Sequence, residues 1–154
     1  MQREHQMNGL TPGEVSAPSS DETTFACLAH FLQLATWFIG PLVVYVMKRE
    51  SRFVAFHSVQ VLLWQAIWVG LSAVCFVALF VVMFASMPQS GGSGPTPHGP
   101  PAAFFLLIPL LWLVFMGSWA LTLILSIVFG VKAARGEWAG YPIIGGWARR
   151  IVGI

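Results

Sequence analysis

The sequence predicts an all-α integral membrane protein, a helical bundle of three transmembrane helices followed by an interfacial C-terminal segment. Two observations favour this fold class. Residues 53–131 contain no Asp, Glu, Lys or Arg, and 56% of the whole chain is hydrophobic while only 9% is charged. Because soluble domains hold about 25% charged residues, an uncharged apolar stretch of this length indicates contact with lipid.

The N-terminal tail and the first span follow from composition. Residues 1–24 are polar and contain several Ser, Thr, Gly and Pro, which is typical of disorder. One Arg stands against four acidic residues, so the tail has a net charge of −3. A single membrane domain is expected over residues 25–154. Its first apolar run, residues 25–47, would extend about 34 Å as one helix, with a kink at Gly40-Pro41.

Two further spans are predicted after a basic turn at residues 48–52. The second covers about residues 59–87 and the third about residues 104–131, and both are apolar and free of formal charge. The segment between them, residues 88–101, is rich in Pro and Gly and is predicted to be a loop. Pro109 marks either a kink or the start of the third helix.

The C-terminal segment, residues 132–154, combines four cations, one Glu, several aromatic residues and frequent glycines. Cationic and aromatic side chains together favour the membrane–water interface. The charges and glycines argue against a fourth span, so an interfacial segment with a short terminal helix is expected. Its predicted interfacial anchors are Trp138, Tyr141, Trp147, Arg149 and Arg150.

The distribution of Lys and Arg predicts the orientation. The turn at 48–52 holds three cations and one Glu, a net charge of +2, and residues 132–154 hold four cations and one Glu, a net charge of +3. Because short cytoplasmic loops are enriched in Lys and Arg, both regions are placed in the cytoplasm. With three spans, the N-terminus and the loop 88–101 would lie outside and the C-terminus would be cytoplasmic.

A short polar motif occurs twice in the apolar segments, as His30-x-x-Gln33-x-x-x-Trp37 and as His57-x-x-Gln60-x-x-x-Trp64. In each copy the spacing places the three side chains on one helical face. Successive spans would run antiparallel, so His30 is expected toward the outer leaflet and His57 toward the inner one, too far apart for one metal site. The motif either lines a polar path or binds a polar group, or it fastens helices together by hydrogen bonds.

Small and hydroxyl side chains recur every four residues in the third span, at Ser118, Thr122, Ser126 and Gly130. Such a stripe is typical of close helix–helix contact in lipid. No span contains Asp or Glu, and no H-E-x-x-H or G-x-S-x-G motif occurs. We therefore expect no enzymatic activity, no cofactor and no metal. No basic surface with interleaved aromatics suggests nucleic acid.

Several motifs together carry a family resemblance. They are Ala26-Cys27-Leu28-Ala29-His30-Phe31, Ile39-Gly40-Pro41-Leu42-Val43, Lys48-Arg49-Glu50-Ser51, Phe53-x-x-Phe56-His57-x-x-Gln60, Lys132-Ala133-Ala134-Arg135-Gly136-Glu137 and Tyr141-Pro142. Over about residues 24–147 the chain resembles the small bacterial membrane proteins of a domain-of-unknown-function family grouped with the Tic-type chloroplast inner-envelope import component. The resemblance implies a compact bundle of three or four spans in a bacterial inner (plasma) membrane, with no assigned enzymatic activity.

The sequence thus predicts a Tic-like, non-enzymatic, multi-pass membrane protein with the lipid bilayer as its surroundings. It would act through helix-mediated association with itself or with other membrane proteins. The alternative is a small transport or conductance component, in which the His and Gln side chains of the repeated motif line a polar route.

Overall fold

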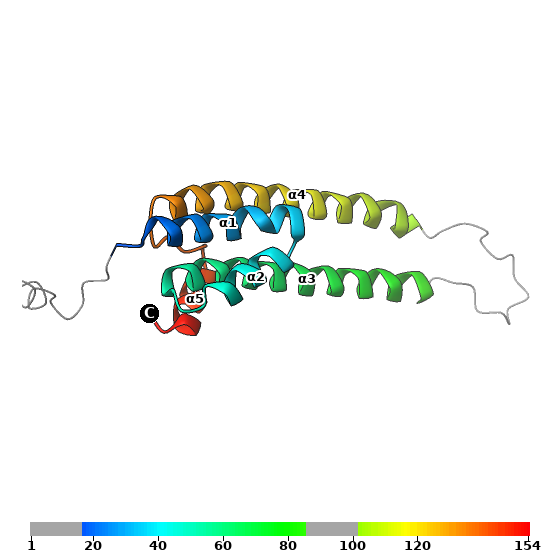
Figure 1. The fold of residues 1–154 in the computed structure, drawn as a ribbon. Helices are drawn as coiled ribbons and strands as arrows, with labels where there is room; N and C mark the ends of the chain where they lie inside the picture. Colours follow the sequence, from blue (N-terminus) through cyan, green and yellow to red (C-terminus); the bar gives the residue numbers. More distant parts are fainter. Residues whose placement is uncertain (1–16, 86–101) are drawn as a thin grey trace, which may run out of the picture.

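The computed structural model describes residues 17–85 and 102–154, and within these ranges its regular secondary structure is all helical, without a strand. The helices are α1 (Ser20–Thr36), α2 (Ile39–Met47), α3 (Arg52–Ala85), α4 (Ala102–Ala134) and α5 (Ile144–Val152). Figure 1 shows α3 and α4 running along the length of the molecule, while α1, α2 and α5 gather around one half of it.

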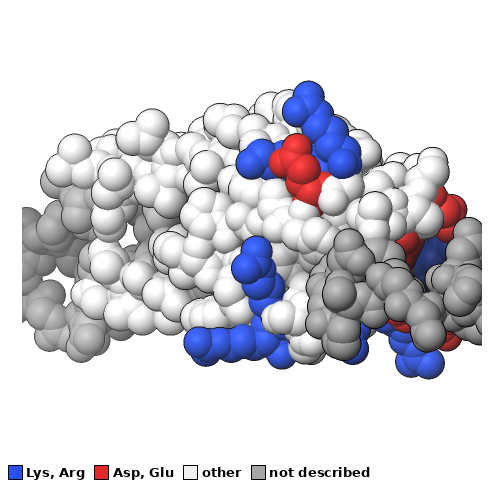
Figure 2. Space-filling view, turned by 90° about the vertical axis from the view of Figure 1, so that its left-hand side faces the viewer, with Lys and Arg blue, Asp and Glu red and all other residues white. Residues whose placement is uncertain are grey.

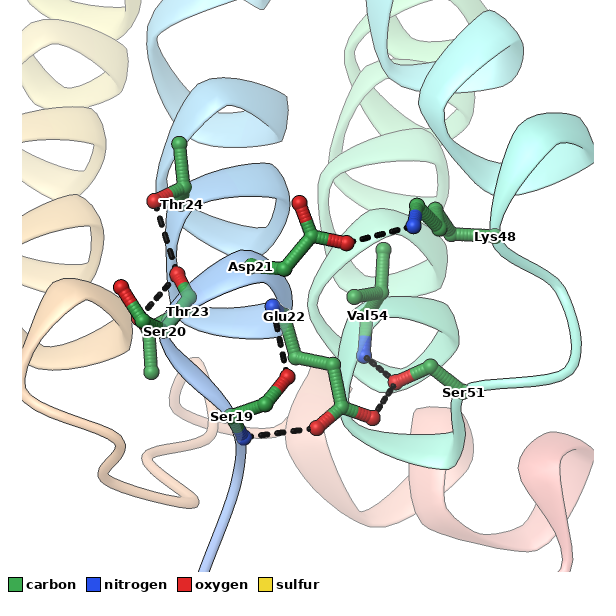
Figure 3. Close-up of polar contacts among 9 residues, drawn as sticks. All are labelled: Ser19, Ser20, Asp21, Glu22, Thr23, Thr24, Lys48, Ser51 and Val54. Atoms are coloured by element: carbon green, nitrogen blue, oxygen red, sulfur yellow. Dashed lines mark hydrogen bonds and ion pairs between the residues drawn. The ribbon is translucent and has the colours of Figure 1, made fainter.

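The first apolar segment forms a helical hairpin in place of the predicted span. Helices α1 and α2 run in opposite directions, so the chain returns to the end from which it started (Figure 1). An ion pair of 2.5 Å joins Asp21 in the first turn of α1 to Lys48 directly after α2. The hydroxyl of Ser51 donates to Glu22 Oε1 at 2.6 Å, as Figure 3 shows. The prediction that residues 25–47 form one helix is therefore wrong.

The reversal takes place at Trp37 and Phe38, just before the predicted kink. Trp37 has φ 56° and ψ −131°, an unusual backbone conformation for a residue other than glycine. Thr36 Oγ1 donates to the Leu32 carbonyl at 2.8 Å and accepts from the Gly40 N–H at 3.0 Å, which satisfies backbone groups at the break. The next residue, Pro41, lies in the first turn of α2, where a proline costs no hydrogen bond.

A capping box fixes the start of α1. Ser19 Oγ accepts from the Glu22 N–H at 3.2 Å, and Glu22 Oε2 accepts from the Ser19 N–H at 2.8 Å (Figure 3). The predicted disordered tail is thus wrong for residues 20–24, which are helical. Residues 1–16 lie outside the described part of the chain.

The hairpin changes the relative direction of the later helices. Because α2 brings the chain back, α1 and α3 both start at the same end and run in parallel, where three successive spans would have made them antiparallel (Figure 1). This parallel arrangement places equivalent positions of the two helices at the same level. It is the feature of the fold on which the buried polar site depends.

Two helical segments, Arg52–Ala85 and Phe105–Ala134, are long and apolar enough to cross a membrane. Helices α3 and α4 contain the second and third predicted spans apart from residues 86 and 87, which lie outside the described residues together with the predicted loop 88–101. Pro109 lies inside α4, so it does not mark the start of that helix.

Charge divides the molecule along its length. One end of the molecule holds the starts of α1 and α3, the ends of α2 and α4, and the whole of α5. We call it the charged end. Seen from this side in Figure 2, Lys and Arg side chains lie at several places over the face, with Asp and Glu among them. The opposite end, where α3 stops at Ala85 and α4 starts at Ala102, has no charged residue in the described ranges. We call it the apolar end.

Candidate functional site

Six polar side chains are buried together where α1, α3, α4 and the segment before α5 meet. We call them the polar cluster: His30, Gln33, His57, Gln60, Ser126 and Tyr141. None of them is more than 4% exposed. Polar groups buried to this degree require hydrogen-bond partners, and most of those partners lie inside the cluster.

The hydrogen-bond directions in the cluster can be derived from one fixed acceptor. His57 Nε2 lies 3.2 Å from the backbone oxygen of Glu137. A carbonyl oxygen only accepts, so His57 Nε2 carries the hydrogen and, in a neutral ring, Nδ1 is the acceptor. His30 Nε2, at 3.1 Å from that Nδ1, must then be the donor. Both neutral histidines therefore hold their proton on Nε2.

The same reasoning extends to Tyr141 and Gln33. His30 Nδ1 is left as an acceptor, so the Tyr141 hydroxyl donates to it at 3.0 Å. The Tyr141 oxygen in turn accepts from Gln33 Nε2 at 3.3 Å. The result is one unidirectional chain of hydrogen bonds from Gln33 through Tyr141, His30 and His57 to the Glu137 carbonyl.

Gln60 ties the segment between α4 and α5 to α3. Its Oε1 accepts from the Tyr141 N–H at 2.5 Å, and its Nε2 donates to the Ala139 carbonyl at 3.4 Å. In this segment Gly140 lies close to Gly145 at the start of α5, where a Cβ on Gly145 would lie only 2.8 Å from the Cα of Gly140. Burial raises the pKa of the Tyr141 hydroxyl, so the phenol stays protonated and able to donate.

The structure brings the two copies of the repeated motif together. The prediction that His30 and His57 lie toward opposite leaflets is wrong, because the hairpin makes α1 and α3 parallel and places the two rings in contact. Their ring centroids are 5.3 Å apart. The sequence predicted Tyr141 at the membrane–water interface. Its central position in the polar cluster was not predicted. The tryptophans of the two motif copies do not occupy equivalent positions. Trp37 lies in the break between α1 and α2, and Trp64 lies within α3.

The small-residue stripe of α4 contacts helices of its own chain. Trp68 Nε1 donates to Ser118 Oγ at 2.8 Å, and Trp64 Nε1 donates to Thr122 Oγ1 at 2.9 Å. Ser126 Oγ accepts from Gln33 Nε2 at 2.7 Å. Gly130 lies against α1, where an added Cβ would meet the Phe31 ring at 2.9 Å. The hydroxyls of the stripe therefore fasten α4 to α3 and α1.

Two of the five predicted interfacial anchors pack against the core, Tyr141 fully buried and Trp138 half-buried. Tyr141 is buried in the polar cluster, and Trp138 packs edge-on against Phe53, with ring centroids 5.0 Å apart. Trp147 is exposed, as are Arg149 and Arg150 in the same helix, α5. The short terminal helix is present as predicted.

The cluster contains no obvious place for a metal ion. In the described part of the chain, no group of three His, Cys, Asp or Glu side chains could hold one. His30 and His57 use the nitrogens that face each other for a mutual hydrogen bond. The chemistry that the geometry supports is a neutral, directional hydrogen-bond network that joins four segments of the chain.

These features define a small all-α membrane protein in which a buried polar cluster joins a helical hairpin to two long apolar helices. The chain belongs to the magnetosome magnetite crystal formation protein family (MamF/MmsF), whose family model matches residues 21–148. The match runs from the first turn of α1 into α5. No curated protein and no solved structure matches the chain. The family is one of bacterial membrane proteins, as expected, but these comparisons do not link the chain to the Tic-type import component.

Proposed function

We propose that this protein is a non-enzymatic, multi-pass membrane component that contributes to magnetite crystal formation by associating with itself or with other membrane proteins. Membership of the family supports the process. One observation carries the mode of action. Beyond the α1–α2 hairpin, α3 and α4 continue toward the apolar end with no third described helix beside them (Figure 1).

An apolar cavity lies between these outer halves of α3 and α4. We call it the outer cavity. It has a volume of about 390 Å³, and its walls include Phe76 and Leu79 from α3 and Leu111, Trp112 and Met116 from α4. Side chains that line such a space lose dispersion contacts. Because packing drives helix association in lipid, a helix of another molecule that fills this space would gain those contacts.

The outer halves are a better association surface than the small-residue stripe. Ser118, Thr122 and Ser126 already bond within the chain. In contrast, Trp112 is 62% exposed and Leu113 is 70% exposed. We therefore assign association to the outer cavity and its rim.

Orientation follows from the two ends of the molecule. We place the charged end in the cytoplasm, because Lys and Arg are enriched on that side of bacterial membranes. Helices α3 and α4 would then cross the membrane, and the segment 88–101 would face the opposite side. The Asp21–Lys48 ion pair keeps the start of α1 beside the cytoplasmic turn. In this proposed orientation the start of α1 would lie on the cytoplasmic side, whereas three spans would put it outside.

The absence of carboxylates on the side away from the cytoplasm favours an architectural role. Residues 53–131 contain no Asp or Glu, so the part of the chain that this proposed orientation puts away from the cytoplasm would supply no carboxylate. Carboxylate oxygens are the usual protein ligands for hard, oxygen-preferring cations. This part of the chain is therefore suited to organising the membrane or its proteins.

Cysteine cross-linking tests the association. In a Cys27→Ala/Cys75→Ala background, Trp112→Cys should form disulfide-linked oligomers or mixed complexes in native membranes. Val46→Cys on α2 is the matched control, because both native side chains are 62% exposed. Equal cross-linking at the two positions, or none at position 112, would contradict the proposal.

Labelling with an impermeant thiol reagent tests the orientation. In the same cysteine-free background, Glu50→Cys and Gly153→Cys should react only from the cytoplasmic side, and Ser93→Cys only from the other side. Reaction of positions 50 and 153 from opposite sides would refute two crossings.

The alternative function is a conductance component, and the directional hydrogen-bond chain from Gln33 to the Glu137 carbonyl favours it. Proton flux into proteoliposomes measures this directly. Flux that is lost in the His30→Leu/His57→Leu double variant would support the alternative. Equal flux from the wild type, the variant and empty vesicles would exclude it.

A further inference from the structure

A second cavity lies at the tip of the α1–α2 hairpin, between α3 and α4. It has a volume of about 490 Å³, in the usual range for small-molecule sites. Its walls include four tryptophans and two glutamines: Trp37, Trp64, Trp68, Trp119, Gln33 and Gln65. We call it the indole cavity. It is separate from the outer cavity, which shares none of these residues.

Both glutamines have an unpaired oxygen. Gln33 and Gln65 are only 4% and 5% exposed, and the Oε1 atom of each is buried without a hydrogen-bond partner. Buried polar atoms in this state are rare, and each requires an explanation. Here the two oxygens belong to side chains that line the same cavity. Each oxygen is itself covered, so its side chain must shift before a donor on a ligand can supply the missing bond.

The polar cluster fixes the orientation of the Gln33 amide. The Ser126 hydroxyl donates its hydrogen to the Thr122 carbonyl at 2.7 Å, and the Tyr141 hydroxyl donates to His30. A Gln33 amide turned by 180° would therefore find no donor for its oxygen. The network thus keeps Nε2 toward Ser126 and Tyr141 and leaves Oε1 unpaired.

The tryptophans can contact a ligand with their ring faces more than with their N–H groups. The Nε1 hydrogens of Trp64 and Trp68 are already used by Thr122 and Ser118. Indole faces pack well against other planar rings. Trp37 and Trp119 are 49% and 58% exposed on the apolar surface, so a ligand that reaches the cavity between them must be soluble in the membrane.

The backbone at this cavity also fits a binding site. Residues in unusual conformations persist where surrounding structure or a ligand holds them, and Trp37 at the break has φ 56°. Non-helical backbone at membrane depth is tolerated where it is covered by protein or lines a cavity. The break between α1 and α2 meets this condition at the indole cavity.

We propose that the indole cavity binds a membrane-soluble phenol of the quinol type. The ligand's ring packs against the tryptophans and one of its hydroxyl groups pairs with the Gln65 amide. The Gln65 amide turns about its terminal torsion, which is soft, to reach the hydroxyl. A lipid acyl chain would fill the space but leave both oxygens unpaired, and a quinone has no hydroxyl to donate.

Titration of purified full-length protein in nanodiscs tests the proposal. The probes are decylubiquinol, kept reduced, and decylubiquinone, which has the same ring and tail without the hydroxyls. Tryptophan fluorescence reports binding, and the unfolding temperature is a second readout. We expect the quinol to bind about tenfold more tightly than the quinone, the effect of one or two hydrogen bonds.

One variant and one matched control test whether the ligand binds in the indole cavity. Gln65→Leu should reduce the preference for the quinol about fivefold to tenfold without lowering the unfolding temperature, because the Gln65 oxygen has no partner in the protein to lose. Trp112→Phe, in the outer cavity, is the matched control and should leave both affinities unchanged.

Three results would overturn the proposal. Equal affinity for quinol and quinone would identify an apolar slot for acyl chains. Absence of saturable binding by either probe would indicate a cavity filled only by water or lipid. A preference that survives Gln65→Leu would show that Gln65 does not recognise the hydroxyls. None of these results bears on association through the outer cavity, which cysteine cross-linking tests separately.

Discussion

The Nε2 atom of His30 lies 3.1 Å from the Nδ1 atom of His57, although the two residues are 27 positions apart in the sequence. This contact requires α1 and α3 to be parallel and in register, and it therefore depends on the hairpin. It is also the middle link of the hydrogen-bond chain that ends at the Glu137 carbonyl. Each of the following predictions tests a contact on which this arrangement depends.

A double-mutant cycle tests the histidine pair. His57→Leu leaves the His30 donor and the Glu137 carbonyl without partners, which should lower the free energy of unfolding by about 2–4 kcal/mol. Adding His30→Leu removes one of these unpaired groups, so the double variant should lose about 1–2 kcal/mol less than the sum of the single variants. The measurement is equilibrium unfolding in mixed micelles.

A distant pair provides the control for the cycle. His57→Leu combined with Trp112→Leu in the outer cavity should be additive within about 0.5 kcal/mol. Additivity of the two histidine variants would show that the rings do not share a hydrogen bond.

Two neighbouring glycines in α5 should respond differently to alanine. A Cβ on Gly145 would lie 2.8 Å from the Gly140 Cα, whereas a Cβ on Gly146 would meet nothing within 4 Å. We expect Gly145→Ala to cost about 1–3 kcal/mol of unfolding free energy, because backbone must shift. Gly146→Ala should be neutral or stabilising by up to about 1 kcal/mol. Equal effects of the two substitutions would refute the close approach of the segment before α5.

The long apolar helices could be predicted from the sequence because their signal is local. An uncharged stretch from Phe53 to Val131 specifies membrane-compatible helices whatever lies beside them. The hairpin could not be predicted in the same way. Gly40-Pro41 marks an interruption, but a kink and a full reversal have the same local sequence. The difference lies in long-range contacts such as the Asp21–Lys48 ion pair.

The sequence-based predictions about the polar cluster also failed where they depended on long-range contacts. Tyr141 follows a run of glycines and cations, which favours an interfacial position by composition. The structure overrides that preference because Gln60 binds its backbone N–H and His30 binds its hydroxyl. The residue types His and Gln were recognisable as buried polar groups in need of partners. Their partners were not recognisable, since each lies on another element.

Acid should loosen the base of the hairpin, and Ser51 should set the pH at which this happens. The hydrogen bond from the Ser51 hydroxyl is the main cause that holds the pKa of Glu22 below its ordinary value of 4.5, with the Ser19 backbone N–H second. Because the pKa of Glu22 is lower in the folded state, its carboxylate stabilises the fold fully above pH 4.5. This stabilisation is lost as the pH falls through the folded-state pKa of Glu22. Ser51→Ala should therefore move the Glu22 midpoint upward, as measured by carboxyl ¹³C shifts in an NMR titration. Ser20→Ala is the control, and a midpoint unchanged by Ser51→Ala would contradict the contact shown in Figure 3.

The tip of the hairpin should depend on the absence of a side chain at Gly40. An added Cβ would lie within 2.3 Å of Thr36 Oγ1 and 2.6 Å of Leu32 Cβ. Relief of this clash displaces the Thr36 hydroxyl from the Leu32 carbonyl and the residue 40 N–H, which leaves backbone groups unpaired at the break. We expect Gly40→Ala to cost about 1–3 kcal/mol of unfolding free energy.

The same substitution should open the hairpin at its base. Spin labels on cysteines at positions 20 and 50, in the Cys27→Ala/Cys75→Ala background, should report a broader and longer distance distribution in Gly40→Ala than in the parent. Gly70→Ala is the matched control in α3, where an added Cβ meets nothing within 4 Å, and should leave the distribution unchanged. If residues 25–47 instead crossed the membrane as one helix, the two labels would lie on opposite sides. Their separation in the parent would then exceed the roughly 30 Å of the hydrocarbon core.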